Sequence, residues 1–222
     1  MKVELLISDI LEPIYPIRNR RNGEIIKVNI KPLTEADSAR LYILQDEKWG
    51  DTFFGWRTFI NNSYHSTINV VTAIDDVAFG IYKYIPCDNY LFIDCMESVR
   101  RRDFNYIGLA IIADAILRSI HFGFNARIKL KSMIQKDENN PDEFYKSLGM
   151  EEEPFPISVL NNYNFDEVSA LPKTFYFRQD GAKEYLEKYE EFSRIMRLGI
   201  NWLEFNKRYE QLKGELVSFE EI

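Results

Sequence analysis

One stretch, residues 90–133, constrains the fold most, because it predicts a strand, a tight turn, a buried helix and a second strand in direct succession. The apolar run Tyr90–Ser98 predicts the first strand. The helix Gly108–Phe122 is apolar on most sides, so we expect other elements to cover it all round. The second strand, Arg127–Met133, should lie parallel to the first because a helix fills the connection. A helix that starts directly after such a turn directs unpaired N–H groups and its positive dipole end at one point, which suits a phosphate group.

Short turns precede this stretch and predict antiparallel neighbours. The runs Ile68–Ile74 and Val77–Ile85 lie close before the strand at Tyr90–Ser98, so all three should form a meander. Further upstream, the dipeptide Asn22-Gly23 predicts a hairpin-like connection into a strand at Ile25–Ile30.

Charged residues near these elements leave alternatives open. Arg18, Arg20 and Arg21 flank the Asn22-Gly23 turn, where they either contact a phosphate or form a solvated turn; the solvated turn is the more common outcome. On the central helix, the residues that share a polar face are Asp114, Arg118 and His121.

Helix signals flank this core on both sides. Thr34 suits the N-cap of a helical region that reaches Trp49–Phe59, whose aromatic residues recur at helical spacing. That row either packs a helix on the sheet or lines a pocket for an apolar group. Downstream, Pro141 suits the start of a short helix that ends at Gly149, and Thr174–Arg178 predicts a last strand after an irregular stretch.

The chain divides into a domain at residues 1–178 and a helical C-terminal extension at residues 179–222. Apolar residues between Tyr185 and Leu212 step by three and four and form a seam, which Gly199 interrupts. The seam either folds back on the domain or pairs with a second copy to give a homodimer.

Composition excludes several kinds of function. A net charge of −7 argues against nonspecific binding to nucleic acid or to an anionic membrane. The two cysteines, Cys87 and Cys95, are too few for the disulfide framework of a secreted protein. The sequence shows neither a signal peptide nor an apolar run long enough to span a membrane. We therefore expect a cytoplasmic protein. The two histidines, His65 and His121, lack metal-ligand spacing, so we expect neither a metal site nor a histidine triad.

Two short motifs together resemble the GCN5-related N-acetyltransferase (GNAT) family. The first is similar to the family's pyrophosphate-binding turn, Gln/Arg-x-x-Gly-x-Gly/Ala, and consists of Asn105, Tyr106, Ile107, Gly108, Leu109 and Ala110. Asn105 stands where Gln or Arg is usual. The second runs from Tyr145 to Met150 and ends a helix. The resemblance is best over residues 90–150, does not reach the C-terminal extension, and implies an α/β (α+β) fold with a mixed, mostly antiparallel central sheet flanked by helices.

The resemblance also implies a function and a set of site residues. Acetyl-coenzyme A would be the cosubstrate, without a metal, and a small-molecule or peptide primary amine would attack the thioester directly. The residues that we expect to bind coenzyme A are Cys95, Met96, Ser98, Arg102, Asn105, Tyr106, Ile107, Gly108, Leu109 and Ala110. Backbone N–H groups near Cys95 and Met96 are expected to stabilise the oxyanion.

Tyr145 holds the family's general-acid position, although an ordinary core tyrosine would satisfy the same pattern. Glu97 is the preferred base and Asp94 the alternative; strand alternation places them on opposite faces unless a bulge intervenes. Cys95 as a nucleophile lacks an activating neighbour in the sequence. A different class of function is a GNAT-like coenzyme A-binding or interaction module without catalysis.

Overall fold

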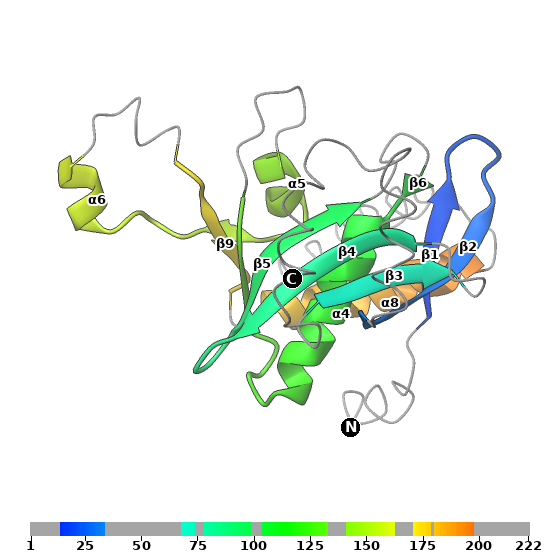
Figure 1. Cartoon of the computed structure of the whole chain (residues 1–222), viewed down its shortest axis with the longest axis horizontal. Coiled ribbons are helices and arrows are strands. Elements are labelled where there is room, and N and C mark those ends of the chain that lie inside the picture. The colour runs from blue at the N-terminus through cyan, green and yellow to red at the C-terminus, as the bar shows by residue number, and fades with distance from the viewer. Residues whose placement is uncertain are drawn as a thin grey trace, which may run out of the picture.

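The computed structural model describes residues 14–33, 68–73, 78–98, 104–132, 141–162, 171–178 and 180–197. In these ranges, nine strands form one sheet in the order β6-β1-β2-β3-β4-β5-β7-β9-β8 (Figure 1). The strands are β1 Ile14–Asn19, β2 Ile25–Pro32, β3 Ile68–Ala73, β4 Ala78–Pro86, β5 Leu91–Ser98, β6 Phe104–Asn105, β7 Ile128–Lys131, β8 Glu151–Glu152 and β9 Thr174–Tyr176. The helices are α4 Ile107–His121, α5 Pro141–Ser147, α6 Ile157–Asn162 and α8 Gly181–Arg197.

The sheet is mixed and mostly antiparallel. Within the described ranges, β5 and β7 form the one parallel pair, and every other pairing is antiparallel. The parallel pair follows from the connection, because α4 occupies the crossover between the two strands. The fold class, the β3–β4–β5 meander and the parallel strand after the helix are all confirmed.

The predicted hairpin is formed by β1 and β2. Its turn contains Gly23 at a φ of 76°, a backbone conformation that glycine adopts without strain. The Asn22 side chain accepts a hydrogen bond from the backbone N–H of Glu24 at 3.0 Å, and the N–H of Asn19 bonds the Glu24 carbonyl at 2.9 Å. The segment before the turn is therefore a full strand of the sheet, where the sequence predicts only a connection.

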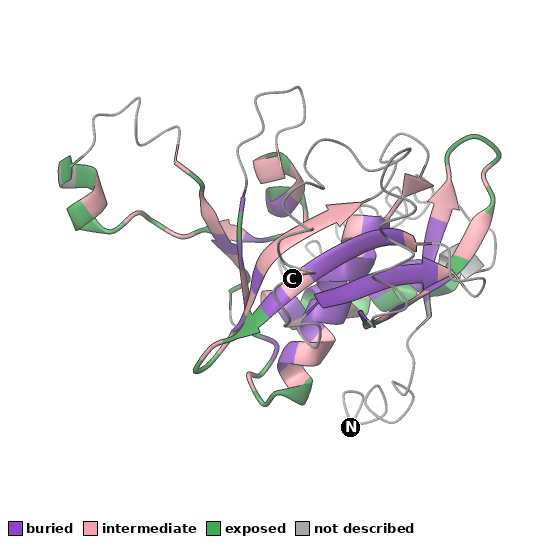
Figure 2. Ribbon diagram, in the orientation of Figure 1, coloured by how far each residue is buried: buried purple, intermediate pink, exposed green. Residues whose placement is uncertain are grey.

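The side chain of Tyr82 on β4 points to the α4 side of the sheet, because its hydroxyl bonds a carboxylate on that helix. It is therefore the reference for assigning the other strand side chains to one face or the other. Side chains in register with it share that face and join one apolar core beneath α4. The opposite face is also buried, at Ile68, Val70 and Ile81. Both faces of β3 and β4 are thus covered (Figure 2), which explains why these strands are apolar almost throughout.

Asp114, which the sequence places on the polar face of α4, is 3% exposed, as the expected cover around this helix requires. Its carboxylate accepts hydrogen bonds from Tyr15 of β1 at 3.0 Å and from Tyr82, and it forms an ion pair with Arg118 at 2.6 Å. Only His121 is exposed as predicted. Three charge-assisted bonds compensate the loss of water around the buried carboxylate and connect α4 to β1 and β4.

The C-terminal helix α8 packs against α4 and β1 on the face opposite the viewer in Figure 1. The Tyr185 hydroxyl donates a hydrogen bond to the Leu109 carbonyl at 2.8 Å, and the Phe192 ring lies 5.0 Å from that of Tyr106. The apolar seam as far as Phe192 is therefore used within the chain. Residues 198–222 lie outside the described ranges, so a dimer through them and the boundary at residue 178 stay predictions.

The stretch between β8 and β9 is more ordered than the sequence predicts, since it contains α6. That helix stands away from the sheet and exposes Ile157 and Leu160 (Figure 1, Figure 2). The predicted helix at Thr34 and the aromatic row Trp49–Phe59 lie outside the described residues. Among the helices that are described, none is long and apolar enough to cross a membrane.

Candidate active site

The N-terminus of α4 presents backbone N–H groups without a side-chain cap. The first hydrogen bond of the helix runs from the Ala110 N–H to the Tyr106 carbonyl at 3.1 Å, so the N–H groups of Ile107, Gly108 and Leu109 precede the regular bonding pattern. Tyr106 provides no capping side-chain bond, and the first turn has no acidic residue. This end of the helix therefore retains the donors and the positive dipole that an anion requires.

Tyr106 enters the helix in a left-handed conformation with a φ of 77°, which is uncommon for a residue with a bulky side chain. Its ring packs edge-on against Phe192 of α8, and its hydroxyl is hydrogen-bonded to the Arg18 side chain of β1. Burial raises the pKa of Tyr106, while Arg18 lowers it. Two elements distant in sequence thus hold the strained turn in place.

Gly108 and Ala110 are small for reasons that the motif alone does not reveal. A Cβ atom at Gly108 would lie 3.0 Å from Cζ of Phe144 on α5, so glycine lets the two helices approach each other. Ala110 is fully buried and belongs to the core. The sequence attributes both small residues to a ligand, which stays a prediction; the structure adds that both also serve the packing around the turn.

The second part of the site is an opening between β5 and β7. Their pairing ends at Ile93 opposite Leu130, whereas β5 continues to Ser98. At the same point β5 bulges, because Asp94 is the extra residue between the Lys83–Cys95 and Tyr84–Ile93 pairs. The outer edge of β5 beyond Ile93 is therefore not paired with β7. Backbone groups of alternate residues face this edge, as the predicted oxyanion donors require.

The bulge decides how the β5 side chains are distributed. Met96 pairs with Tyr82 and shares the face of α4, as does Ser98, whose partner Gly80 lies against Ile107. Cys95 pairs with Lys83 and is on the opposite face. The predicted coenzyme-binding residues of β5 are therefore divided between the two faces of the sheet.

Asp94 and Glu97 lie on the same face. Glu97 pairs with Ile81 on the face opposite α4, and Asp94 forms an ion pair with Lys83 at 2.8 Å on that face. The default of strand alternation, which separates the two carboxylates, is wrong here because the bulge shifts the alternation by one residue. Either carboxylate can therefore serve an acceptor that approaches from this side.

Cys95 is not suited to act as a nucleophile. Burial, together with the charge of Asp94, raises the pKa of its thiol to about 12, and the opposing influence of Lys83 is smaller. At neutral pH the thiol carries its proton, which agrees with the expectation that nothing nearby activates it.

Tyr145 is 6% exposed and lies in the core on the α4 side of the sheet. Its ring packs against Phe175 of β9 at a centroid distance of 5.3 Å. The start of α5 is fixed by Asp142, which accepts a hydrogen bond from Ser132 after β7 and lies 3.4 Å from Lys173. These contacts set where the tyrosine lies relative to the end of β7.

The helix α5 ends as predicted at Gly149, with a φ of 84° and a hydrogen bond from Met150 N–H to the Tyr145 carbonyl at 3.2 Å. Tyr145 and Glu97 occupy opposite faces of the sheet. The two predicted catalytic side chains could meet a common substrate only through the opening between β5 and β7.

One residue beside the turn, Phe144, could not be found from the sequence, because no local motif encodes its packing against Gly108. Arg18 is a candidate phosphate contact from the sequence alone, and the pairing of β1 with β6 places it opposite Asn105. Arg102, which the sequence predicts to bind the cosubstrate, lies outside the described residues. No group of three or more metal-ligating side chains occurs in the described part of the chain.

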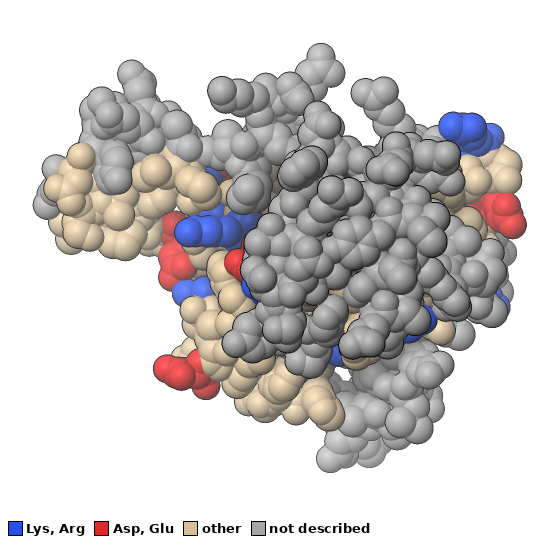
Figure 3. All heavy atoms as spheres, viewed as in Figure 1, with Lys and Arg blue, Asp and Glu red and all other residues tan. Residues whose placement is uncertain are grey.

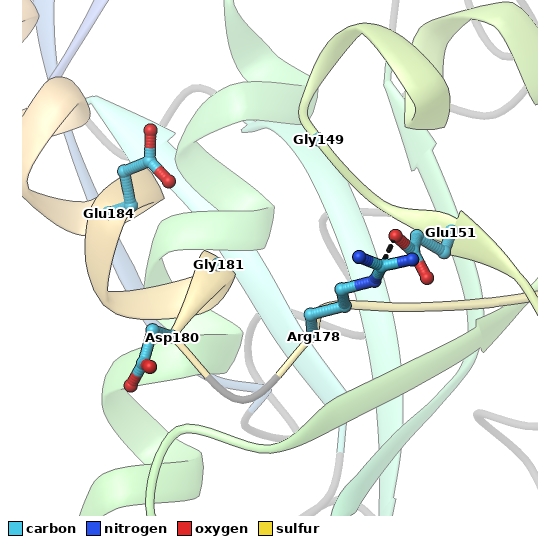
Figure 4. A pocket seen from close by; sticks show the side chains of 6 residues that line it. All are labelled: Gly149, Glu151, Arg178, Asp180, Gly181 and Glu184. Atoms are coloured by element: carbon cyan, nitrogen blue, oxygen red, sulfur yellow. Dashed lines mark ion pairs between the residues drawn. The ribbon is translucent and has the colours of Figure 1, made fainter.

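A separate cavity of about 520 Å³ lies beyond the end of α5 (Figure 4). The residues that line it are Gly149, Glu151, Arg178, Asp180, Gly181 and Glu184. Arg178 forms an ion pair with Glu151, drawn as a dashed line in Figure 4. None of the predicted site residues lines this cavity, so it is distinct from the turn before α4.

Among known proteins, the chain is similar to solved structures only. No family model and no curated protein sequence matches the chain. An acetyltransferase of the GNAT family from Staphylococcus aureus Mu50 is 16% identical with a TM-score of 0.44, covering 68% of this chain and 99% of that one. A GNAT-family acetyltransferase from Listeria monocytogenes 4b F2365 is 10% identical with a TM-score of 0.47, covering 72% and 97%.

An N-acetylglutamate synthase from Neisseria gonorrhoeae, complexed with coenzyme A and N-acetyl-glutamate, is 13% identical with a TM-score of 0.45. The match covers 68% of this chain and 35% of that chain, so this protein corresponds to about a third of the synthase. Strands β3, β4, β5, β7 and β9 and helices α4 and α5 follow one another in the predicted order, while β6, β8 and α6 are additional elements. The fold is GNAT-like. Ile107, the first residue of α4, and the backbone carbonyl of Glu97 on β5 both adjoin Gly80 of β4.

Proposed function

We propose that the protein is an acetyl-coenzyme A-dependent N-acyltransferase whose acceptor is a primary amine. The observation that carries this proposal is the uncapped N-terminus of α4, whose first residue adjoins Glu97 across Gly80, together with the edge of β5 that β7 does not pair beyond Ile93. N–H groups of the first helical turn suit the pyrophosphate of coenzyme A, and the opening between β5 and β7 suits its extended arm. Backbone donors on β5 would then face the thioester carbonyl.

The chemistry requires a proton to leave the amine and another to reach the departing thiolate. Asp94 and Glu97 share the face opposite α4, so an amine that approaches there meets a carboxylate, directly or through water. Tyr145 lies in the core on the α4 side of the sheet, and its phenol would protonate the departing thiolate. The pKa of the Cys95 thiol, about 12, keeps it protonated and therefore a poor nucleophile at neutral pH. This favours direct attack of the amine on the thioester over transfer of the acetyl group through Cys95.

The alternative function, a coenzyme A-binding module without catalysis, has less support than the sequence suggests. One argument for it is an exposed apolar seam on the C-terminal helix, and that seam packs inward as far as Phe192. Asn105 in place of Gln or Arg remains in its favour. The two functions differ in whether thiol is released.

The test measures free thiol from acetyl-coenzyme A with a panel of amines, for the wild type and Tyr145→Phe. We expect Tyr145→Phe to lower turnover about 100-fold or more, with the affinity for coenzyme A unchanged, because only the protonation of the thiolate is lost. Tyr176→Phe, which removes a half-buried hydroxyl near Glu151, is the matched control and should retain activity.

Equal turnover in Tyr145→Phe and wild type would remove Tyr145 from the mechanism. Coenzyme A binding without thiol release across the panel would favour the non-catalytic module. A wild-type protein that does not bind coenzyme A at all would contradict both functions.

A further inference from the structure

The β1–β2 hairpin holds an arginine against the turn that precedes α4. β1 pairs with β6 in a register that sets Arg18 opposite Asn105 and Asn19 opposite Phe104. Residues opposite each other in an antiparallel pair have Cα atoms about 5 Å apart, and their side chains point to the same face. Because α4 begins two residues after Asn105, Arg18 lies within side-chain reach of the first turn of that helix.

The Arg18 guanidinium lies against the hairpin turn. A Cβ atom at Gly23 would make an ordinary contact with it, 3.4 Å from an amino nitrogen. The same guanidinium is hydrogen-bonded to the hydroxyl of Tyr106, the residue directly before α4. Arg20, at the start of the turn, is close enough to Tyr106 to lower its pKa. Arg18 and Arg20 therefore both belong to the surroundings of the helix N-terminus.

Within the ranges that the structure describes, neither Arg18 nor Arg20 forms an ion pair with a carboxylate, and the first turn of α4 has no acidic residue. Basic atoms are visible at the free end of the hairpin in Figure 3. In a protein with a net charge of −7, two arginines that form no ion pair with a described carboxylate and lie beside a helix N-terminus create a local positive potential.

We propose that Arg18 and Arg20 bind a phosphate group of coenzyme A and supply the charge that Asn105 lacks. This inference rests on the proposed function, and it adds a phosphate contact from the β1–β2 hairpin to the donors of α4. Guanidinium groups bind phosphate with two parallel N–H···O bonds, which an asparagine cannot match in charge or number. Strand pairing brings to the site a basic group that the motif at residues 105–110 omits.

The experiment measures the dissociation constants of coenzyme A and of 3′-dephospho-coenzyme A for wild type, Arg18→Gln and Arg20→Gln. Arg127→Gln is the matched control, because it removes the same charge from an exposed arginine at the opposite end of α4. Arg20→Gln is informative even if the loss of the Tyr106 contact destabilises Arg18→Gln, since Arg20 is exposed. We expect both variants to bind coenzyme A about 10-fold more weakly, and Arg127→Gln to match the wild type.

The two ligands identify the phosphate. A loss confined to coenzyme A assigns the arginines to its 3′-phosphate, and an equal loss for both ligands assigns them to the pyrophosphate. Affinities of both variants equal to that of Arg127→Gln would overturn this proposal while leaving the proposed function intact. A wild-type protein that binds neither ligand would instead contradict the proposed function itself.

Discussion

Gly80 on β4 lies directly under the first residue of α4. Adding a side chain there tests how closely β4 and α4 pack at the site. A Cβ atom at Gly80 would lie 2.8 Å from Cγ2 of Ile107 and 3.1 Å from the carbonyl oxygen of Glu97. Carbon atoms prefer separations of about 3.5–4.0 Å, so Gly80→Ala requires Ile107 to move by roughly an ångström. The residue that moves carries one of the N–H groups at the N-terminus of α4.

The magnitude follows from the crowding. Overpacking a core by one methyl group costs about 1–3 kcal/mol, and the better strand preference of alanine offsets about 0.5–1 kcal/mol of that. We therefore expect Gly80→Ala to lower the free energy of unfolding by about 1–2 kcal/mol, which lowers Tm by roughly 2–8 °C for a chain of this size. Coenzyme A affinity should fall as well, because the helix N-terminus is displaced.

Thermal and urea unfolding measure the first effect, and titration calorimetry measures the second. Gly181→Ala is the control, because its Cβ atom would make an ordinary contact at 3.4 Å with Phe177. Removing the obstructing methyl in Gly80→Ala/Ile107→Ala should recover part of the loss in a double-mutant cycle. If Gly80→Ala unfolds and binds like Gly181→Ala, the close approach of β4 and α4 is refuted.

Two further predictions concern titrating groups in the core. Burial and then the Asp114 carboxylate raise the pKa of Tyr82, so the stability that this tyrosine contributes is complete below the ordinary tyrosine pKa near 10 and is lost as pH rises through the raised value. The free energy of unfolding should therefore fall above pH 10. Urea titrations between pH 9 and 11 should show that Tyr82→Phe makes this slope shallower by up to about 1.4 kcal/mol per pH unit. An unchanged slope would argue against a neutral buried Tyr82. At pH 8, iodoacetamide should alkylate Cys95 at least about 100-fold more slowly in the native protein than in the urea-unfolded chain, because burial raises the pKa of the Cys95 thiol to about 12. Mass spectrometry of the modified peptide gives both rates. Similar rates would contradict the buried, protonated thiol.

The local signals in the sequence were enough for most of the elements. Hydrophobic runs and short turns locate β3, β4 and β5, and a helix between two apolar runs requires β7 to be parallel to β5. The Asn22-Gly23 dipeptide locates the first hairpin, and Gly149 marks the end of α5. These features depend on residues within a few positions of one another, so a single sequence contains them.

Tertiary structure decided how those elements form the site. The sequence places Asp114 on a polar face of α4 but does not identify its partners, which are Tyr15 and Tyr82, 99 and 32 residues away. The sequence contains no mark of the bulge at Asp94, which moves that carboxylate to the face of Glu97. Both outcomes arise from contacts between strands, whose partners periodicity does not specify.

The turn before α4 shows the same division most clearly. Its glycine, its small residue and its position between a strand and a helix are visible in the sequence and predict an anion site. The sequence does not show that Phe144 requires Gly108, that Phe192 of α8 supports Tyr106, or that pairing of β1 with β6 brings Arg18 to the turn. A backbone motif is encoded locally, whereas the charges and rings around it come from segments that only the folded sheet brings together.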